Sequence, residues 1–221
     1  MVKTHRDTIS VNDCQVLAHY QFEADQYIIT LESKEIADST RPGQFVHLSV
    51  SGMLAMRRPI SVMSVDADNG TFDLLYKIVG EGTKQLADRK IGDVLSVIGP
   101  IGNGFELTDR KIPLLIGGGV GMPPMIAIAQ KIKDNAYYNP YVILGSEVPF
   151  PFEASQSSLS GFNSSKFYTM PLLEEWRVPC GLASLQDYEG VYRGYVTDLA
   201  REYLDSLSSS DLNEVEIFTC G

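Results

Sequence analysis

The sequence Gly-Gly-Gly-Val-Gly at residues 117–121 restricts the possible folds more than any other feature. It follows a short apolar run at 113–116 and precedes a run at 124–133 with apolar residues at helical spacing. A strand that enters a helix through a glycine-rich turn is typical of dinucleotide-binding domains, in which backbone amides approach a pyrophosphate. The usual fingerprint ends in glycine or alanine. Here it ends in Pro124, which suits a first helical turn because the N–H it lacks would have no partner there.

This turn predicts a binding site for a nicotinamide dinucleotide, and a tight glycine-rich turn without a ligand is the alternative. The candidate contacts are Gly117, Gly118, Gly119, Gly121 and Pro124.

The second half of the chain alternates between two kinds of pattern. Strand-like runs lie at 113–116, 141–144, 166–169 and 215–219, and helical patterns lie at 124–133 and 195–207. Such alternation predicts a parallel sheet between helices, a three-layer α/β domain. The segment 149–165 is rich in Ser, Pro and Phe, and we expect an irregular excursion there.

The first half has short strand-like runs separated by turns, a pattern typical of a β-barrel or sandwich. Short β-branched or aromatic runs lie at 27–31, 45–50, 60–65, 72–79 and 94–98, with turn formers between them. One helical pattern lies at 83–89. A boundary follows a turn-rich stretch near 107–111, so we expect two domains, 1–108 and 109–221, the second C-terminally incomplete.

Residues 57–61, Arg-Arg-Pro-Ile-Ser, suit a strand that holds a flavin diphosphate. Arg58 offers a planar cation that binds phosphate through two hydrogen bonds. Pro59 belongs at a strand start or edge, and Ser61 supplies a small hydroxyl where a larger side chain would collide with the flavin ring. The alternative is a pair of surface arginines beside a strand.

Gly82 and Thr83 stand at the start of the helical pattern in the first half. Unpaired N–H groups at a helix start bind anions, and glycine lets a phosphate come close. An ordinary helix capped by Thr83 is the alternative.

Charge and composition exclude several classes of function. The formal net charge of −10 argues against a nucleic acid as partner. No apolar run is long enough to span a membrane, and residues 1–12 lack the apolar core of a signal peptide, so we expect a cytoplasmic protein. The three cysteines are far apart, and the three histidines have no metal-ligand spacing, so we expect no metal site.

Cys220 follows the apolar run at 215–219. The carboxyl ends of parallel strands line the ligand crevice, so this thiol could contact a nicotinamide ring. A buried, inert cysteine is the commoner outcome.

Several short motifs, taken together, resemble the ferredoxin–NADP reductase superfamily, and most closely the electron-transfer subunits of class 1B dihydroorotate dehydrogenase. They are Arg-Pro-Ile-Ser at 58–61, Tyr-Lys at 76–77, Gly-Glu-Gly-Thr at 80–83, Gly-Pro-Ile-Gly-Asn-Gly-Phe at 99–105 and the run at 117–124. Pro-Gly-Gln-Phe-Val-His at 42–47 and Gly-Tyr-Val-Thr-Asp at 194–198 strengthen the resemblance.

The resemblance implies an antiparallel β-barrel that binds FAD, followed by an α/β parallel-sheet domain that binds NAD. It also implies a catalytic flavoprotein subunit as partner, a hetero-oligomer and a place in pyrimidine biosynthesis. The FAD contacts that it implies are Arg58, Pro59, Ile60, Ser61, Leu75, Tyr76, Lys77, Gly82 and Thr83. Ser61 and Cys220 are the residues that we expect beside the reacting rings.

The family continues beyond Cys-Gly into a cysteine cluster that holds a [2Fe-2S] centre, whereas this sequence stops at Gly221. Such a centre takes four thiolates, and Cys14 and Cys180 cannot replace the cluster. We therefore expect a flavin but no iron–sulfur centre in these 221 residues.

Glu147 follows the strand-like run at 141–144, where a carboxylate binds a ribose 2′-OH and repels a 2′-phosphate, so we expect NAD rather than NADP. The predicted function is electron transfer from NADH through FAD to an acceptor. The alternatives are a free-standing NAD(P)H:flavin or acceptor oxidoreductase, and a non-catalytic binding module that keeps the fold.

Overall fold

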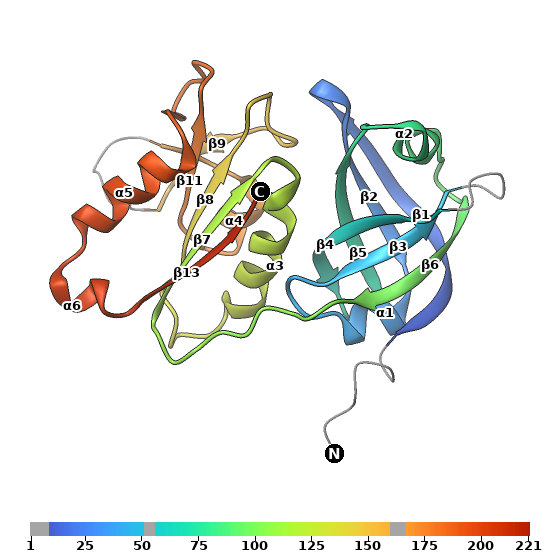
Figure 1. Cartoon of the computed structure of the whole chain (residues 1–221), viewed down its shortest axis with the longest axis horizontal. Coiled ribbons are helices and arrows are strands. Elements are labelled where there is room, and N and C mark those ends of the chain that lie inside the picture. Colours follow the sequence, from blue (N-terminus) through green and yellow to red (C-terminus); the bar gives the residue numbers. More distant parts are fainter. Residues whose placement is uncertain (1–8, 51–55, 160–166) are drawn as a thin grey trace. The chain divides into compact units, whose positions relative to one another are not determined.

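The computed structural model describes residues 9–50, 56–159 and 167–221, and these fall into two compact units, Met1–Phe105 and Glu106–Gly221 (Figure 1). The division lies slightly before the predicted boundary at 108. Each unit has its own hydrophobic core.

The first unit is a closed antiparallel barrel of six strands in the order β1-β2-β5-β4-β3-β6. The strands are β1 (Ser10–Phe22), β2 (Gln26–Glu32), β3 (Phe45–Ser49), β4 (Arg58–Asp66), β5 (Thr71–Lys77) and β6 (Val94–Ile101). Pairing of β1 with β6 closes the barrel, which decides between the barrel and the sandwich that the sequence left open. The short helices η2 (Glu23–Asp25), α1 (Lys34–Ser39) and α2 (Glu81–Ala87) lie in its connections.

The sequence patterns missed β1, the longest strand of the barrel. Its polar residues obscure the apolar alternation, and only Cys14 and Val16 are fully buried. Elsewhere alternation sets the barrel interior: Phe72, Leu74 and Tyr76 of β5 belong to one core cluster.

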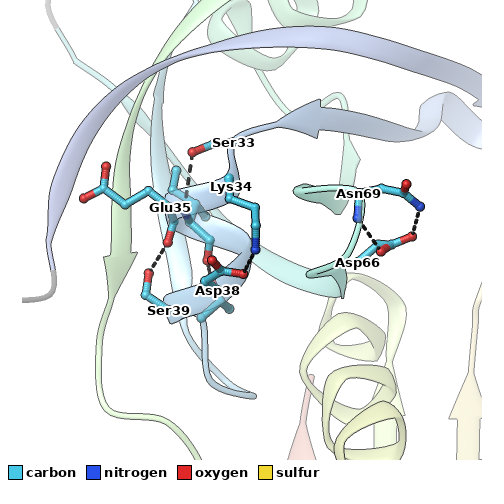
Figure 2. Close-up of polar contacts among 9 residues, drawn as sticks. Ser33, Lys34, Glu35, Asp38, Ser39, Asp66 and Asn69 are labelled. Atoms are coloured by element: carbon cyan, nitrogen blue, oxygen red, sulfur yellow. Dashed lines mark hydrogen bonds and ion pairs between the residues drawn. The ribbon is translucent and has the colours of Figure 1, made fainter.

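Side-chain caps fix the barrel's tight connections (Figure 2). The Ser33 hydroxyl accepts a hydrogen bond from the Ile36 amide at 3.3 Å and begins α1. In the turn between β4 and β5, Asp66 accepts bonds from the Asn69 backbone amide at 2.9 Å and from its side-chain amide at 2.7 Å. The backbone bond is the main cause that lowers the pKa of Asp66. These local bonds satisfy backbone groups that the sheet leaves free.

The second unit contains a five-stranded parallel sheet in the order β12-β11-β8-β7-β13. Its strands are β7 (Ile112–Gly118), β8 (Tyr141–Gly145), β11 (Cys180–Ser184), β12 (Tyr192–Arg193) and β13 (Val215–Cys220). Helices α3 (Met122–Ile132) and α5 (Val196–Ser206) cover opposite faces of the sheet (Figure 1). The predicted order of an antiparallel barrel and a parallel α/β domain is confirmed.

One predicted strand of this sheet is wrong. Residues Tyr168–Thr169 form β10, which pairs antiparallel with β9 (Ser155–Gln156) outside the parallel sheet. The parallel sheet contains β11 instead, and the small residues of β11 have little strand propensity. A Cβ on Gly181 would lie 3.0 Å from the Tyr141 hydroxyl and 3.1 Å from Leu199, so packing selects the glycine there. The short helices α4 (Pro171–Glu175) and α6 (Ser209–Leu212) complete the unit.

Candidate functional site

The two adjacent arginines at the start of β4 have different surroundings. Arg57 donates to the Ser96 carbonyl at 2.7 Å and to the Ser96 hydroxyl at 3.0 Å, so it ties β4 to β6. Arg58 donates from Nη2 to the Met56 carbonyl at 2.8 Å, while its Nε is buried without a hydrogen-bond partner among the described residues. A buried donor left unpaired costs about 1–3 kcal/mol. Arg57 therefore makes its hydrogen bonds within the barrel, whereas Nε of Arg58 makes no such bond with a described residue.

Gly82, in the first turn of α2, makes room for the Arg58 side chain. A Cβ at this position would lie 2.6 Å from Arg58 Cδ and 2.7 Å from its Nε. Glycine thus allows the guanidinium to lie against the start of α2. The sequence placed Arg58 and Gly82 in one phosphate site, and the fold brings them together.

Thr83 holds the segment that leads into α2. Its hydroxyl accepts from the amides of Val79 at 2.9 Å and Gly80 at 3.3 Å, and donates to the Gly80 carbonyl at 3.1 Å. The helix begins at Glu81, slightly before the position that the sequence pattern gave. Because this hydroxyl is already satisfied, the side chain of Thr83 shapes the turn, and only its backbone is left for a ligand.

Two of the residues predicted to contact a flavin have side chains that lie in the barrel core. Ile60 belongs to the core cluster, and so does Tyr76, which stacks on Tyr27 with ring centroids 5.3 Å apart. The Tyr76 hydroxyl is 2.8 Å from His19 Nε2, and burial raises its pKa. These two residues can therefore contact a cofactor only through their backbone. Strand alternation directs the side chains of Ser61, Leu75 and Lys77 to the other side of the barrel wall, and Pro59 is exposed.

The glycine-rich turn has the predicted strand–turn–helix form. β7 ends at Gly118, a 3₁₀ turn η3 (Gly119–Gly121) follows, and α3 begins at Met122 with Pro124 in its first turn. A Cβ on Gly118 or on Gly119 would meet nothing within 4 Å, so these two residues face open space. They leave room for a ligand at the backbone.

Packing requires glycine at Gly117 and Gly121, and the ligand contacts expected of these two residues stay a prediction. A Cβ on Gly117 would lie 2.9 Å from the Met122 Cα, and a Cβ on Gly121 would overlap the Cys220 carbonyl group. Both positions are closed by the protein's own backbone. They bring the turn close to α3 and to the end of β13, and the open part of the turn is Gly118 and Gly119.

Cys220 lies beside this turn although it is a hundred residues away in the sequence. β13 pairs parallel with β7, with Cys220 opposite Gly117. The chain leaves β7 for β8 on one side, and β13 lies on the other, so the sheet order reverses at this point. Ligands of open α/β sheets bind at such a reversal, beyond the carboxyl ends of the strands. Cys220 is half-buried, whereas Cys14 and Cys180 are buried.

Glu147 lies just past the carboxyl end of β8, is exposed, and makes no hydrogen bond or ion pair with another described residue. The sequence analysis missed the two buried serines beside it, Ser146 and Ser184. Ser146 directly follows the buried strand β8, and Ser184 is the last residue of the buried strand β11. A small hydroxyl at the carboxyl end of a buried strand is the signal that could have found them.

Within residues 9–50, 56–159 and 167–221, no three His, Cys, Asp or Glu side chains are grouped so that they could hold a metal ion. No helix in the same part of the chain has the length and apolar character needed to cross a membrane.

Comparison with known proteins agrees with this geometry. The family model of the oxidoreductase FAD-binding domain matches residues 13–105, which is the barrel without its first residues. The electron transfer subunit of dihydroorotate dehydrogenase B (NAD(+)) from Bacillus cereus strain 03BB102 is 31% identical over 195 residues, 76% of this chain and 73% of that protein. The subunit of the same name from Enterococcus faecalis is 37% identical over 123 residues, 54% of this chain and 47% of that protein.

Solved structures share the fold of both units. The structure described as an NADH-dependent reduced ferredoxin–NADP oxidoreductase that carries out flavin-based electron bifurcation superposes with a TM-score of 0.70 at 23% identity. The superposition covers 91% of this chain and 64% of the chain in that structure. The ferredoxin reductase of carbazole 1,9a-dioxygenase superposes with a TM-score of 0.71 at 20% identity, over 96% of this chain and 61% of that one.

Proposed function

Because the chain belongs to the family of dihydroorotate dehydrogenase B electron transfer subunits, we propose that it takes electrons from NADH through bound FAD. We further propose that it delivers them to a catalytic flavoprotein subunit of the dihydroorotate dehydrogenase type, in pyrimidine biosynthesis. The observation that carries the proposal is the buried, unpaired Nε of Arg58 against Gly82, inside the segment matched by the FAD-binding model.

The residues of the barrel fit a flavin dinucleotide. Arg58 supplies the cation for a pyrophosphate, and an oxygen of that group would satisfy Nε. Thr83 holds the turn before α2 so that Gly82 keeps the space for the guanidinium. Ser61 contributes a small hydroxyl on the side of the wall away from the core. Bound FAD would accept a hydride from the donor and pass its two electrons on one at a time.

The residues of the α/β unit fit NADH as the donor. Gly118 and Gly119 leave their backbone open to a pyrophosphate, and Cys220 lies beside the same turn, where we place the nicotinamide ring. Glu147 offers an unpaired carboxylate at the end of β8 for the ribose hydroxyls. The same charge repels the 2′-phosphate of NADPH, so NADH is the preferred donor.

The test of the flavin site is a matched pair of arginine variants. Arg58→Ala should weaken FAD binding about 10- to 100-fold, because a charge-assisted hydrogen bond contributes roughly 1.5–3 kcal/mol. Arg57→Ala removes the same charge one residue earlier but breaks bonds to Ser96, so it should lower thermal stability and leave FAD affinity in place. FAD affinity of Arg58→Ala equal to wild type would contradict the proposal.

The proposal of a catalytic partner has its own test. Co-expression of the chain with a dihydroorotate dehydrogenase catalytic subunit, followed by gel filtration, should give a stable complex of the two chains. A chain that stays alone and passes electrons from NADH to free flavins would favour the free-standing reductase. A chain that takes up no FAD would favour the non-catalytic binding module.

A further inference from the structure

The residues on both sides of Glu147 make hydrogen bonds, although its own side chain makes none with another described residue. The Ser146 amide donates to the Ala183 carbonyl at 3.1 Å, and the Ser146 hydroxyl accepts from the Val148 amide at 3.3 Å. The residues before and after Glu147 are therefore fixed. Its carboxylate, exposed and without a partner among the described residues, starts from a defined backbone position.

Ser184, the last residue of β11, completes this arrangement from the neighbouring strand. Its hydroxyl donates to the Ser146 carbonyl at 2.8 Å and accepts from the Gln186 amide at 3.1 Å. Ser184 is 3% exposed and Ser146 7% exposed, so water cannot easily replace these bonds. One buried hydroxyl thus joins the segments that follow β8 and β11.

Aromatic packing joins the same two segments a second time. The rings of Phe150, after β8, and Tyr188, after β11, lie 6.4 Å apart in an edge-on arrangement. Two of the contacts between these segments, the bonds of Ser146 with Ala183 and with Ser184, lie directly beside Glu147.

We infer that Ser184 is a positioning residue for nicotinamide-cofactor selectivity, acting through the Ser146 carbonyl to hold the Glu147 carboxylate where a ribose 2′-hydroxyl is bound and a 2′-phosphate rejected. This inference rests on the proposed function and extends it to a residue that need not touch the cofactor. A backbone of fixed position presents the carboxylate to the ribose at the same place in every complex, whereas a displaced backbone weakens the discrimination between hydroxyl and phosphate.

The consequence of removing the hydroxyl follows from the bonds. Ser184→Ala leaves the Ser146 carbonyl and the Gln186 amide without their partner, so the segment carrying Glu147 loses one of the contacts that fix its position. NAD⁺ should bind about tenfold more weakly, which corresponds to one lost ordering hydrogen bond, while NADP⁺ binding should change little or improve.

A double-mutant cycle separates this role from a general structural one. The measured quantity is the ratio of the dissociation constants of NADP⁺ and NAD⁺, obtained by calorimetric titration of the full 221-residue chain with each oxidised cofactor. Ser184→Ala and Glu147→Gln should each reduce the ratio. The double variant should show the ratio of Glu147→Gln alone, because Ser184 acts only through that carboxylate.

The chain offers a matched control in Ser157. Its hydroxyl also donates to one oxygen, of Glu174 at 2.7 Å, and also accepts from the amide two residues later, of Leu159 at 3.1 Å. Ser157→Ala removes the same pair of bonds elsewhere in the unit. It should leave the ratio unchanged.

If Ser184→Ala does not give a cooperative thermal transition, Ser146→Ala replaces it, because this change removes only the bond to the Val148 amide and should reduce the ratio less. Unchanged ratios in both serine variants, or additive effects of Ser184→Ala and Glu147→Gln, would overturn the inference. A wild-type chain without preference for NAD⁺ would overturn it too, and is the only one of these results that also contradicts the proposed donor.

Discussion

Gly118 offers a clean way to test the nicotinamide site, because a side chain there disturbs a ligand but not the protein. Its φ of −120° and ψ of 131° are ordinary strand values that any residue adopts. A Cβ on Gly118 would meet nothing within 4 Å. Gly118→Val therefore adds bulk only to the space that we assign to the dinucleotide.

The expected magnitudes have opposite signs for folding and binding. Replacing glycine at a compatible backbone position stabilises a protein by roughly 0.4–1 kcal/mol, because the unfolded chain loses freedom. Blocking one backbone contact to a phosphate should cost about 1.5–3 kcal/mol of binding, a 10- to 100-fold rise in the dissociation constant of NAD⁺.

Gly121 is the matched control, since it lies in the same turn with the opposite surroundings. A Cβ there would overlap the Cys220 carbonyl, so Gly121→Ala should destabilise the unit by about 1–3 kcal/mol, as overpacking does. Thermal unfolding and calorimetric titration with NAD⁺ give both quantities. Wild-type affinity in Gly118→Val, or wild-type stability in Gly121→Ala, would refute the division of the turn into an open and a closed part.

Three further experiments test other parts of the structure. Cys220 should be the cysteine that a maleimide labels in the native chain, and NAD⁺ should protect it; mass spectrometry that finds either buried cysteine labelled first, or no protection, would contradict its place beside the turn. Tyr76→Phe should cost about 1–3 kcal/mol in urea unfolding, because it leaves Nε2 of His19 without its partner, yet keep the FAD content, and a colourless protein would restore Tyr76 as a side-chain contact. Burial raises the pKa of Glu174, but hydrogen bonds from Ser158 and Ser157 outweigh it and lower the pKa below its usual 4.5. The stability from these bonds is present above pH 4.5 and is lost as the pH falls through the lowered value, so Glu174→Gln should reduce the acid sensitivity of unfolding, and an unchanged pH profile would exclude this carboxylate.

The sequence predicted the fold where local pattern and packing agree. The glycine-rich turn gives a strong local signal because its conformation and its packing require small residues, so β7, the turn and α3 were found together. β11 was missed because packing selects small residues such as Gly181, and these weaken the strand signal. β1 was missed because most of its residues are polar or exposed.

The candidate site could be predicted as a set of residues but not as a set of roles. Arg57 and Arg58 are equivalent in sequence, and only their hydrogen bonds distinguish the structural arginine from the one with a free donor. Gly118 and Gly121 are likewise equivalent until the end of β13 is placed against one of them. Such roles depend on contacts between segments far apart in the chain, which no local pattern contains.

The central claim is that NADH gives its electrons to a flavin held by this chain, with the donor bound at the open glycines. Rapid anaerobic mixing of NADH with the FAD-loaded chain, followed by visible absorbance, tests it most directly. The account predicts that NADH bleaches the flavin of the wild type, and that Gly118→Val keeps its FAD but needs about 10- to 100-fold more NADH for the same rate. A wild-type flavin that stays oxidised in excess NADH, or a Gly118→Val flavin bleached at the wild-type NADH concentration, would contradict it.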